Sequence, residues 1–215
     1  DYNIFSPKGV IMGSALAFTA ETFFPIRTYK KVESDPLNAL TNALNKISEK
    51  DGGAIQIIVR PTLSGWMKMG VELASKMNQG KKMKEALLEI SPGVWATMMR
   101  FFRSIPTGKD TTKQPKEPYH LSAMEQEMLK NIEEKSSKGG MDVNIRIITS
   151  SENPEKADMY LNGLLNAFNQ FSIYEYGNSF KPVKYNIKKF ANDFIYRNFV
   201  DKDRIILNTE ELASI

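Results

Sequence analysis

Two segments of the chain share one local pattern, a proline-capped helix between two β-rich stretches, and this pattern constrains the fold most. Asp35-Pro36 and Asn153-Pro154 each place a side-chain acceptor before a proline. Proline fits the first turn of a helix because no N–H donor is needed there. Asp51-Gly52-Gly53 ends the first helix, and Gly139-Gly140 comes before the second unit. The sequence therefore predicts two strand–helix–strand units.

The composition of the β-rich stretches predicts how deeply each strand is buried. In the first unit, an extended region runs from Ser14 to Ile26, and the β-branched stretch 54–60 predicts a strand buried on both faces. In the second unit, Val143, Ile145 and Ile147 alternate with Asn144, Arg146 and Ile148, which predicts a half-buried strand. The other expected elements are a strand at 178–185 kept from the centre by Pro182, a helix through Phe190 and Phe194, a strand at 204–207 and a terminal turn capped by Asn208 or Thr209.

Two right-handed strand–helix–strand units can share one antiparallel sheet with both helices on one face. The sequence therefore predicts an α+β fold of the ferredoxin-like, split βαβ type, with a large methionine-rich helical insertion between the two halves. We expect the first β-α-β half at 1–61, the helical insertion and linker at 62–138, and the second half with a C-terminal lead-in at 139–215.

The insertion is the part of the chain whose role the sequence leaves open. Between Thr62 and His120 it holds both tryptophans, six of the eleven methionines, and ten Lys or Arg against five Asp or Glu residues. Three interpretations stand: ordinary core, a surface for a protein partner or self-association, and a bilayer-surface contact. The candidate partner surface is Trp66, Met67, Met77, Trp95, Met98, Met99 and Phe102. The candidate nucleic-acid contacts are Lys68, Lys81, Lys82, Lys84, Arg100 and Arg103.

Residues that could carry catalysis are scarce. The chain has no cysteine, which excludes thiolate chemistry and cysteine-ligated metals, and His120 is its single histidine. Neither Gly80-Lys81 nor Gly108-Lys109 fits the spacing of a phosphate-binding P-loop. Adjacent acids such as Glu210 and Glu211 point apart on a helix and are predicted to be solvated or helix-end charges. We therefore predict no catalytic residue, metal, cofactor or small-molecule substrate.

The overall charge and the hydropathy of the chain constrain its partners only weakly. The formal net charge is +4 and the pI is near 9.0, a weak excess that permits nucleic acid as a partner without demanding it. The uncharged run at residues 9–20, and the longer one at residues 159–174, are both shorter than the roughly 18 to 20 apolar residues that a membrane-spanning helix needs.

Three strings in the chain resemble the N-terminal region of bacterial type IV secretion or conjugative DNA-transfer ATPases. They are Phe24-Pro25-Ile26-Arg27-Thr28-Tyr29, Asp35-Pro36-Leu37-Asn38-Ala39-Leu40 and Gly53-Ala54-Ile55-Gln56-Ile57-Ile58-Val59-Arg60-Pro61. The tail 206–215 is similar to the segment that leads into the HerA/FtsK-like motor core of those proteins. Their ATP site belongs to that core, and the Walker motifs are absent from this sequence.

The resemblance implies a non-catalytic accessory domain of a longer DNA-transfer ATPase. It would work in the cytoplasm, at the inner face of the membrane, and assemble with the motor domain or with other subunits. The alternative is a nucleic-acid-binding module that uses the basic insertion to contact DNA.

Overall fold

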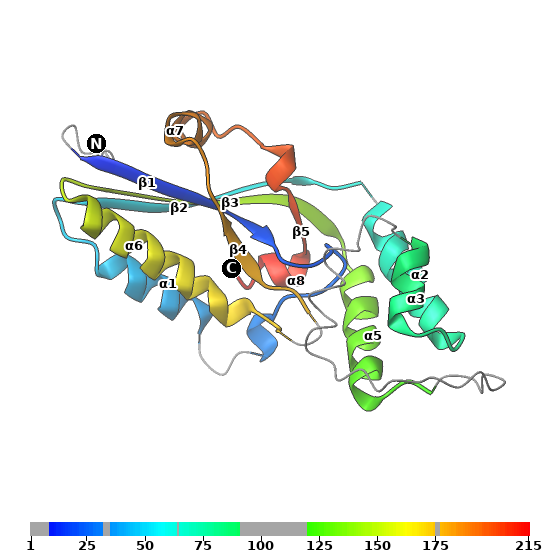
Figure 1. The fold of residues 1–215 in the computed structure, drawn as a ribbon. Coiled ribbons are helices and arrows are strands. Elements are labelled where there is room, and N and C mark those ends of the chain that lie inside the picture. Colours follow the sequence, from blue (N-terminus) through cyan, green and yellow to red (C-terminus); the bar gives the residue numbers. More distant parts are fainter. Residues whose placement is uncertain (1–8, 32–34, 64, 91–119, 175–176) are drawn as a thin grey trace, which may run out of the picture.

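The computed structural model describes residues 9–31, 35–63, 65–90, 120–174 and 177–215, which form an α+β fold around a five-stranded antiparallel sheet (Figure 1). The strands are β1 (Val10–Phe18), β2 (Gly52–Pro61), β3 (Gly140–Ser151), β4 (Phe180–Val183) and β5 (Ile205–Asn208). The seven α-helices of these ranges are α1 (Pro36–Asn45), α2 (Gly65–Asn78), α3 (Met83–Ile90), α5 (Ala123–Ser136), α6 (Pro154–Ala167), α7 (Ile187–Ile195) and α8 (Thr209–Leu212). The predicted α+β class and the antiparallel sheet are confirmed.

β3 is the central strand of the sheet. β2 pairs along one side of it, from Gly52 opposite Ser150 to Pro61 opposite Met141. The other side of β3 is shared, because β1 pairs with residues 145–151 and β5 pairs with residues 140–143. β4 adds to the outer side of β1, so the strand order is β2-β3-β1-β4, with β5 continuing the line of β1.

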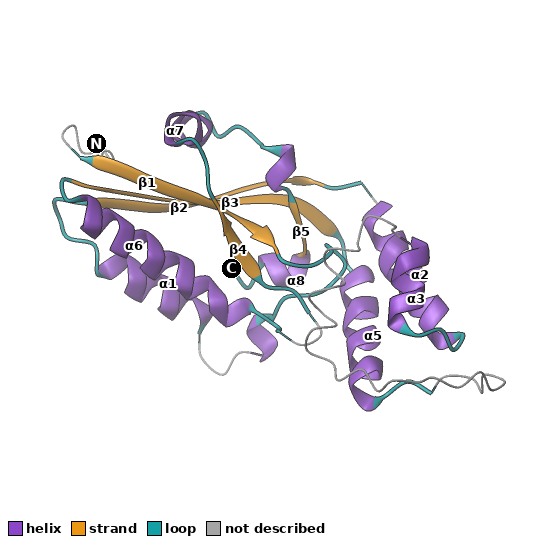
Figure 2. Ribbon diagram, in the orientation of Figure 1, coloured by secondary structure: helices purple, strands orange, loops and turns teal. Residues whose placement is uncertain are grey.

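Helices cover both faces of the sheet, but unequally (Figure 2). α1 and α6 lie on one face, where Leu161 and Leu164 belong to the same core cluster as Ile145 and Ile147. α7 lies alone on the other face, and its Phe190 packs in a smaller cluster. That smaller cluster consists of Ala15, Ile148 and Phe190 with partly buried Ile11, Ala54, Val183, Tyr185, Ile187 and Phe194.

The predicted helix starts are confirmed in atomic detail. The Asp35 carboxylate accepts a hydrogen bond from the Leu37 N–H at 3.0 Å, and the Asn153 side chain accepts one from the Glu155 N–H at 2.8 Å. Asn208 caps α8. These signals are local, since the cap and the amides it satisfies lie within one turn of chain.

The predicted burial of β2 and β3 is wrong in both cases. β2 is an edge strand, with Ile57 37% and Val59 43% exposed, although its composition predicts burial on both faces. β3 is buried on both faces from Asp142 to its end, although the alternation of its side chains predicts one solvent-exposed face. Strand position in the sheet, which no local pattern encodes, decides burial here.

Phe23 and Phe24 do not continue β1 as the sequence predicts. They lie in a turn, each 1% exposed, and pack among α2, α3 and α5 in a second hydrophobic core. This core packs the described helices of the insertion against the loop that follows β1, and these helices lie at one end of the sheet (Figure 1). Residues 91–119 of the expected helical insertion and linker lie outside the described residues.

Trp66 fastens the start of α2 to the start of β3. Its indole lies against Gly140, where an added Cβ would come within 2.6 Å of the indole nitrogen. The absence of a side chain at Gly140 is therefore what allows this close approach. None of the helices in the described ranges has the length and apolar content that a bilayer crossing requires.

Candidate functional site

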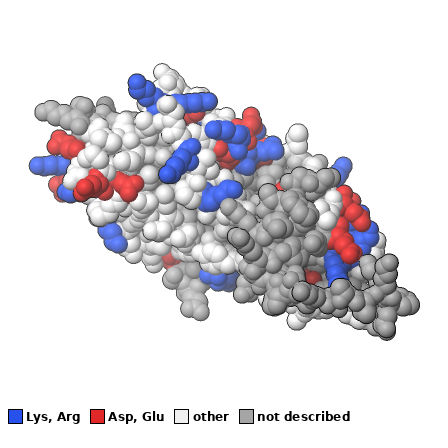
Figure 3. Space-filling model, viewed as in Figure 1, with Lys and Arg blue, Asp and Glu red and all other residues white. Residues whose placement is uncertain are grey.

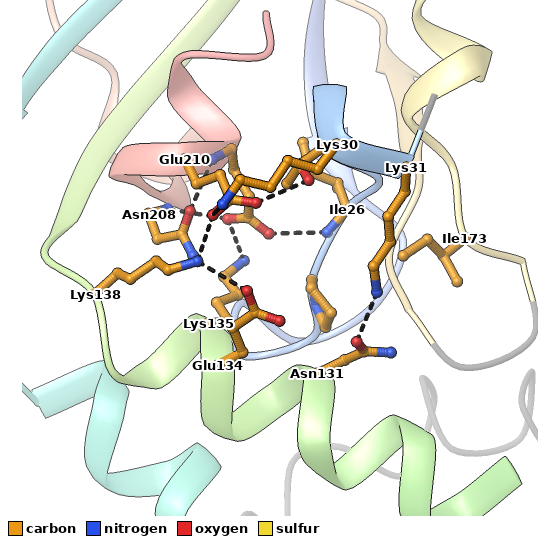
Figure 4. A pocket seen from close by; sticks show the side chains of 13 residues that line it. Ile26, Lys30, Lys31, Asn131, Glu134, Lys135, Lys138, Ile173, Asn208 and Glu210 are labelled. Carbon is orange, nitrogen blue, oxygen red and sulfur yellow. Dashed lines mark hydrogen bonds and ion pairs between the residues drawn. The ribbon is translucent and has the colours of Figure 1, made fainter. Parts of the chain in front are cut away.

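A buried ion pair joins α5 to α8 beneath a surface pocket (Figure 4). Lys135 and Glu211 side chains are each 1% exposed, and Lys135 Nζ lies 3.0 Å from Glu211 Oε2. The same ammonium group donates to the carbonyl oxygens of Phe24 and Ile206, each at 3.1 Å. The three N–H bonds of the ammonium group thus have three acceptors. We call this arrangement the Lys135–Glu211 junction.

Glu211 completes the junction from the other side. Its carboxylate accepts from the Ile26 N–H and from the Asn208 N–H, both at 2.9 Å. The Asn208 side chain in turn accepts from the Glu211 N–H at 2.8 Å, so the same carboxylate also closes the capping box of α8. One side chain therefore holds the loop after β1, α5 and α8 together.

The chemistry of the junction is structural. Burial lowers the pKa of the Lys135 amine, and the nearby Glu211 carboxylate opposes that shift. A charged pair with every donor satisfied can persist in a low-dielectric interior, because each lost contact with water is replaced. The hydrogen-bond donors and acceptors of the Lys135–Glu211 junction bind one another. This arrangement suits a structural contact between elements rather than a chemical reaction.

A second, more exposed layer of ion pairs lies above the junction. Glu210 accepts from Thr28 Oγ1 at 3.0 Å and from Lys30 Nζ at 2.9 Å, and it also pairs with Lys138. The hydrogen bond from Lys138, followed in size of effect by the one from Lys30, lowers the pKa of Glu210 to about 2. Lys138 also pairs with Glu134 at 3.0 Å, which links this layer to α5.

Acid should weaken this layer within a defined range. Because the pKa of Glu210 is about 2 in the folded chain against an ordinary 4.5, its stabilisation is present above pH 4.5 and is lost as the pH falls towards 2. Glu210→Gln should therefore lower the melting temperature near neutral pH, and the gap to wild type should close across that range. A gap that stays constant down to pH 2 would contradict this account. Circular dichroism melts at several pH values measure it.

The candidate partner surface of the insertion is only partly on the surface. Trp66 and Met77 are 6% and 1% exposed and belong to the interior, so for these two side chains the core interpretation replaces the partner-surface one. Helical spacing predicts which side chains share a face but not what that face contacts. Met67 is half-buried. Trp95, Met98, Met99 and Phe102 lie outside the described residues.

The candidate nucleic-acid contacts of the insertion are partly neutralised. Glu89 accepts from Lys76 at 2.8 Å and from Lys81 at 2.7 Å, and these hydrogen bonds lower its pKa to about 2. Lys68 and Lys82 are exposed. The side chain of Lys84, together with Arg100 and Arg103, lies outside what the structure describes.

The predicted helix-end position of Glu210 and Glu211 is confirmed, since both lie in the first turn of α8. Glu211 is not solvated, because it is buried. The Asn208–Glu211 spacing signals a capping box, and no local signal shows that Lys135 lies opposite. His120 is exposed, and in the described ranges no three His, Asp or Glu side chains come together to hold a metal ion.

Fold and junction together define an α+β domain whose C-terminal segment is locked into its interior. A family model described as a domain of unknown function (DUF8128) matches residues 5–215. The chain belongs to this family. Comparison with curated proteins gave no match, and comparison with solved structures gave none either.

Proposed function

We propose that this chain is a non-catalytic assembly and docking module of a type IV secretion-like DNA-transfer ATPase, built on a ferredoxin-like sheet. The strand order β4-β1-β3-β2 with antiparallel neighbours supports the ferredoxin-like plan. So does the placing of α1 between β1 and β2 and of α6 between β3 and β4. β5 is then an addition to that plan.

One observation carries the proposal. The tail 206–215, which resembles the lead-in to a motor core, forms part of β5 and all of α8, and Glu211 anchors it in the interior. A lead-in held by a strand pairing and a buried ion pair is stiff. A displacement at this tail would therefore move the sheet and α5 with it, as coupling between an accessory domain and a motor requires.

The free edge of β2 offers a surface for another subunit. It is ten residues long, and among the described strands it pairs with β3 alone. The opposite edge, β4, is four residues long and contains Pro182, a feature that blocks strand pairing. Antiparallel pairing of two β2 strands centred on Ile57 would place Ile55 opposite Val59, so that apolar side chains meet on one face.

The oligomeric state tests this proposal. Light scattering coupled to size exclusion should show a concentration-dependent dimer or larger species, and Ile57→Lys should shift it towards the monomer. Leu63→Lys is the matched control, because Leu63 is 89% exposed just beyond β2. A strictly monomeric wild type would remove the edge pairing, and nucleotide hydrolysis by the purified chain would overturn the non-catalytic assignment.

Nucleic-acid binding through the basic insertion has less support. Lys76 and Lys81, two of the cations closest to the turn between α2 and α3, share the single carboxylate of Glu89. Neither of them is therefore an unpaired surface cation.

A further inference from the structure

The two faces of the sheet differ in charge. Residues 180–204, which supply β4, α7 and the segment after α7, contain seven Lys or Arg and three Asp or Glu. Residues 35–51 and 152–167, which supply α1 and α6, contain three Lys or Arg and six Asp or Glu. Basic side chains follow the α7 side of the molecule, and acidic ones gather where α6 begins (Figure 3). We call the sheet face covered by α7 and residues 196–204 the α7 face.

Cations from several elements meet on the α7 face. Lys181 is paired with Ala17 and so points to the same side of the sheet as Ala15, which packs with Phe190. Lys202 lies 4.2 Å from the centroid of the Tyr185 ring, which brings the 3-10 turn 201–203 beside the start of α7. The fold thus gathers charges that are spread along the chain.

Most of the cations in residues 180–204 have no acidic partner. Five side chains are exposed, and within the described ranges none of them forms an ion pair: Lys181, Lys184, Lys188, Lys189 and Arg197. The insertion differs, because there Glu89 holds two lysines. Unpaired surface cations raise the local positive potential and attract anions.

Three of the five occupy positions that are unfavourable for stability. Lys188 and Lys189 lie in the first turn of α7, whose N-terminal end favours negative charge. Arg197 has a φ of 54° just beyond α7, where its N–H bonds the Phe194 carbonyl and the Asn198 N–H bonds the Asp193 carbonyl. This is a Schellman motif, whose left-handed position favours glycine. Residues that break local rules in this way are expected at functional or strained sites.

We propose that the α7 face binds DNA through its phosphate backbone. That the ligand is the DNA moved by a transfer ATPase rests on the proposed function. The evidence for binding itself is the charge of the α7 face. Exposed cations contact phosphates independently of base sequence, and Tyr196, 73% exposed beside Arg197, offers a ring on which a base can stack.

A lipid surface fits this face less well. An amphipathic helix binds a bilayer by burying its apolar side among the lipids. In α7 the apolar side is already buried against the sheet, because Phe190 is 2% exposed and Ile187 and Phe194 pack in the same cluster. The outward side presents Lys188 and Lys189, which can contact phosphates but cannot insert, and its one exposed large apolar residue is Ile195, at 55%.

Neutralisation of the helix lysines tests the proposal. Fluorescence anisotropy with labelled single-stranded and duplex oligonucleotides should show binding by the wild-type chain that weakens steeply with salt. Lys188→Gln/Lys189→Gln should weaken binding about tenfold and reduce the salt slope by about 1.8 for duplex or about 1.4 for single strands. The matched control is Lys50→Gln/Lys156→Gln, which removes the same charge from exposed residues of the opposite side.

Arg197→Gly separates ligand binding from folding. Glycine suits the left-handed position, so the melting temperature should rise while DNA affinity falls several-fold. A merely structural Arg197 would move only the melting temperature. The proposal is overturned if the wild type does not bind DNA at low salt, or if the control loses as much affinity as the helix variant. Binding to phosphatidylserine vesicles without binding to DNA also overturns it. If the chain does not bind DNA but still self-associates through β2, the DNA-binding proposal is wrong and the proposed function stands.

Discussion

Lys135→Met is expected to lower the free energy of unfolding by about 3–5 kcal/mol. Methionine fills similar space but leaves the Glu211 carboxylate, 1% exposed, without a cation. It also removes the donor that the Phe24 and Ile206 carbonyls share. Urea denaturation followed by circular dichroism measures the loss.

A double variant shows whether the loss comes from the unpaired charge. Lys135→Met/Glu211→Gln removes both charges and keeps an amide oxygen that can accept from the Ile26 or Asn208 N–H. It should recover part of the stability, because a neutral pair in a buried site avoids the cost of an isolated charge. If the double variant is no more stable than Lys135→Met, the loss is one of packing and not of charge.

Arg146→Met is expected to lower the free energy of unfolding by about 2–4 kcal/mol, the cost of leaving several partly buried acceptors without donors. Arg146 is 2% exposed at the centre of β3. Its guanidinium donates to the Asp193 carbonyl at 2.8 Å, to Gln56 Oε1 at 3.2 Å and to the Asn198 carbonyl. Two of these acceptors lie at the end of α7, so Arg146 secures that helix to the sheet.

Hydrogen exchange can localise the effect of this variant. Amides of α7 and of the segment that follows it should lose protection in Arg146→Met before the amides of β1 do, since only the α7 side loses its contacts. The control is Arg60→Met, because the Arg60 side chain is 40% exposed, its partner Asp201 is 73% exposed, and its buried partner Asp142 keeps an ion pair with Arg204 at 3.6 Å. Equal losses in both variants would contradict the special role of Arg146.

The order of helices and strands outside residues 91–119 was predictable because its signals are local. A cap, a proline and an apolar stripe lie within a few residues of one another, and such signals placed α1 and α6 correctly. The burial of the strands was not predictable, since it depends on neighbours far away in the sequence. Asn144 and Arg146 give β3 the sequence pattern of a strand with one solvent-exposed face. In the structure, however, α7 and the segment after it cover both side chains.

The junction escaped prediction for a related reason. Lys135 follows Glu133 and Glu134 near the end of an amphipathic helix, a context typical of solvated charges. Its partner belongs to the last helix, and the two meet only because β5 pairs with the first residues of β3. Sequence patterns give the period of a helix but not the depth at which each side is buried.

The place of β5 along the chain bears on how the molecule is made. On the side away from β2, the first four residues of β3 lack their pairing partner, and Lys135 lacks its carboxylate, until residues 205–211 have been synthesised. A nascent polypeptide that ends before them carries an uncompensated charge and a stretch of strand that is unpaired along one side, both costly to bury. Closure of this domain therefore waits on translation of its last strand, and ribosome-bound intermediates should stay open at that corner.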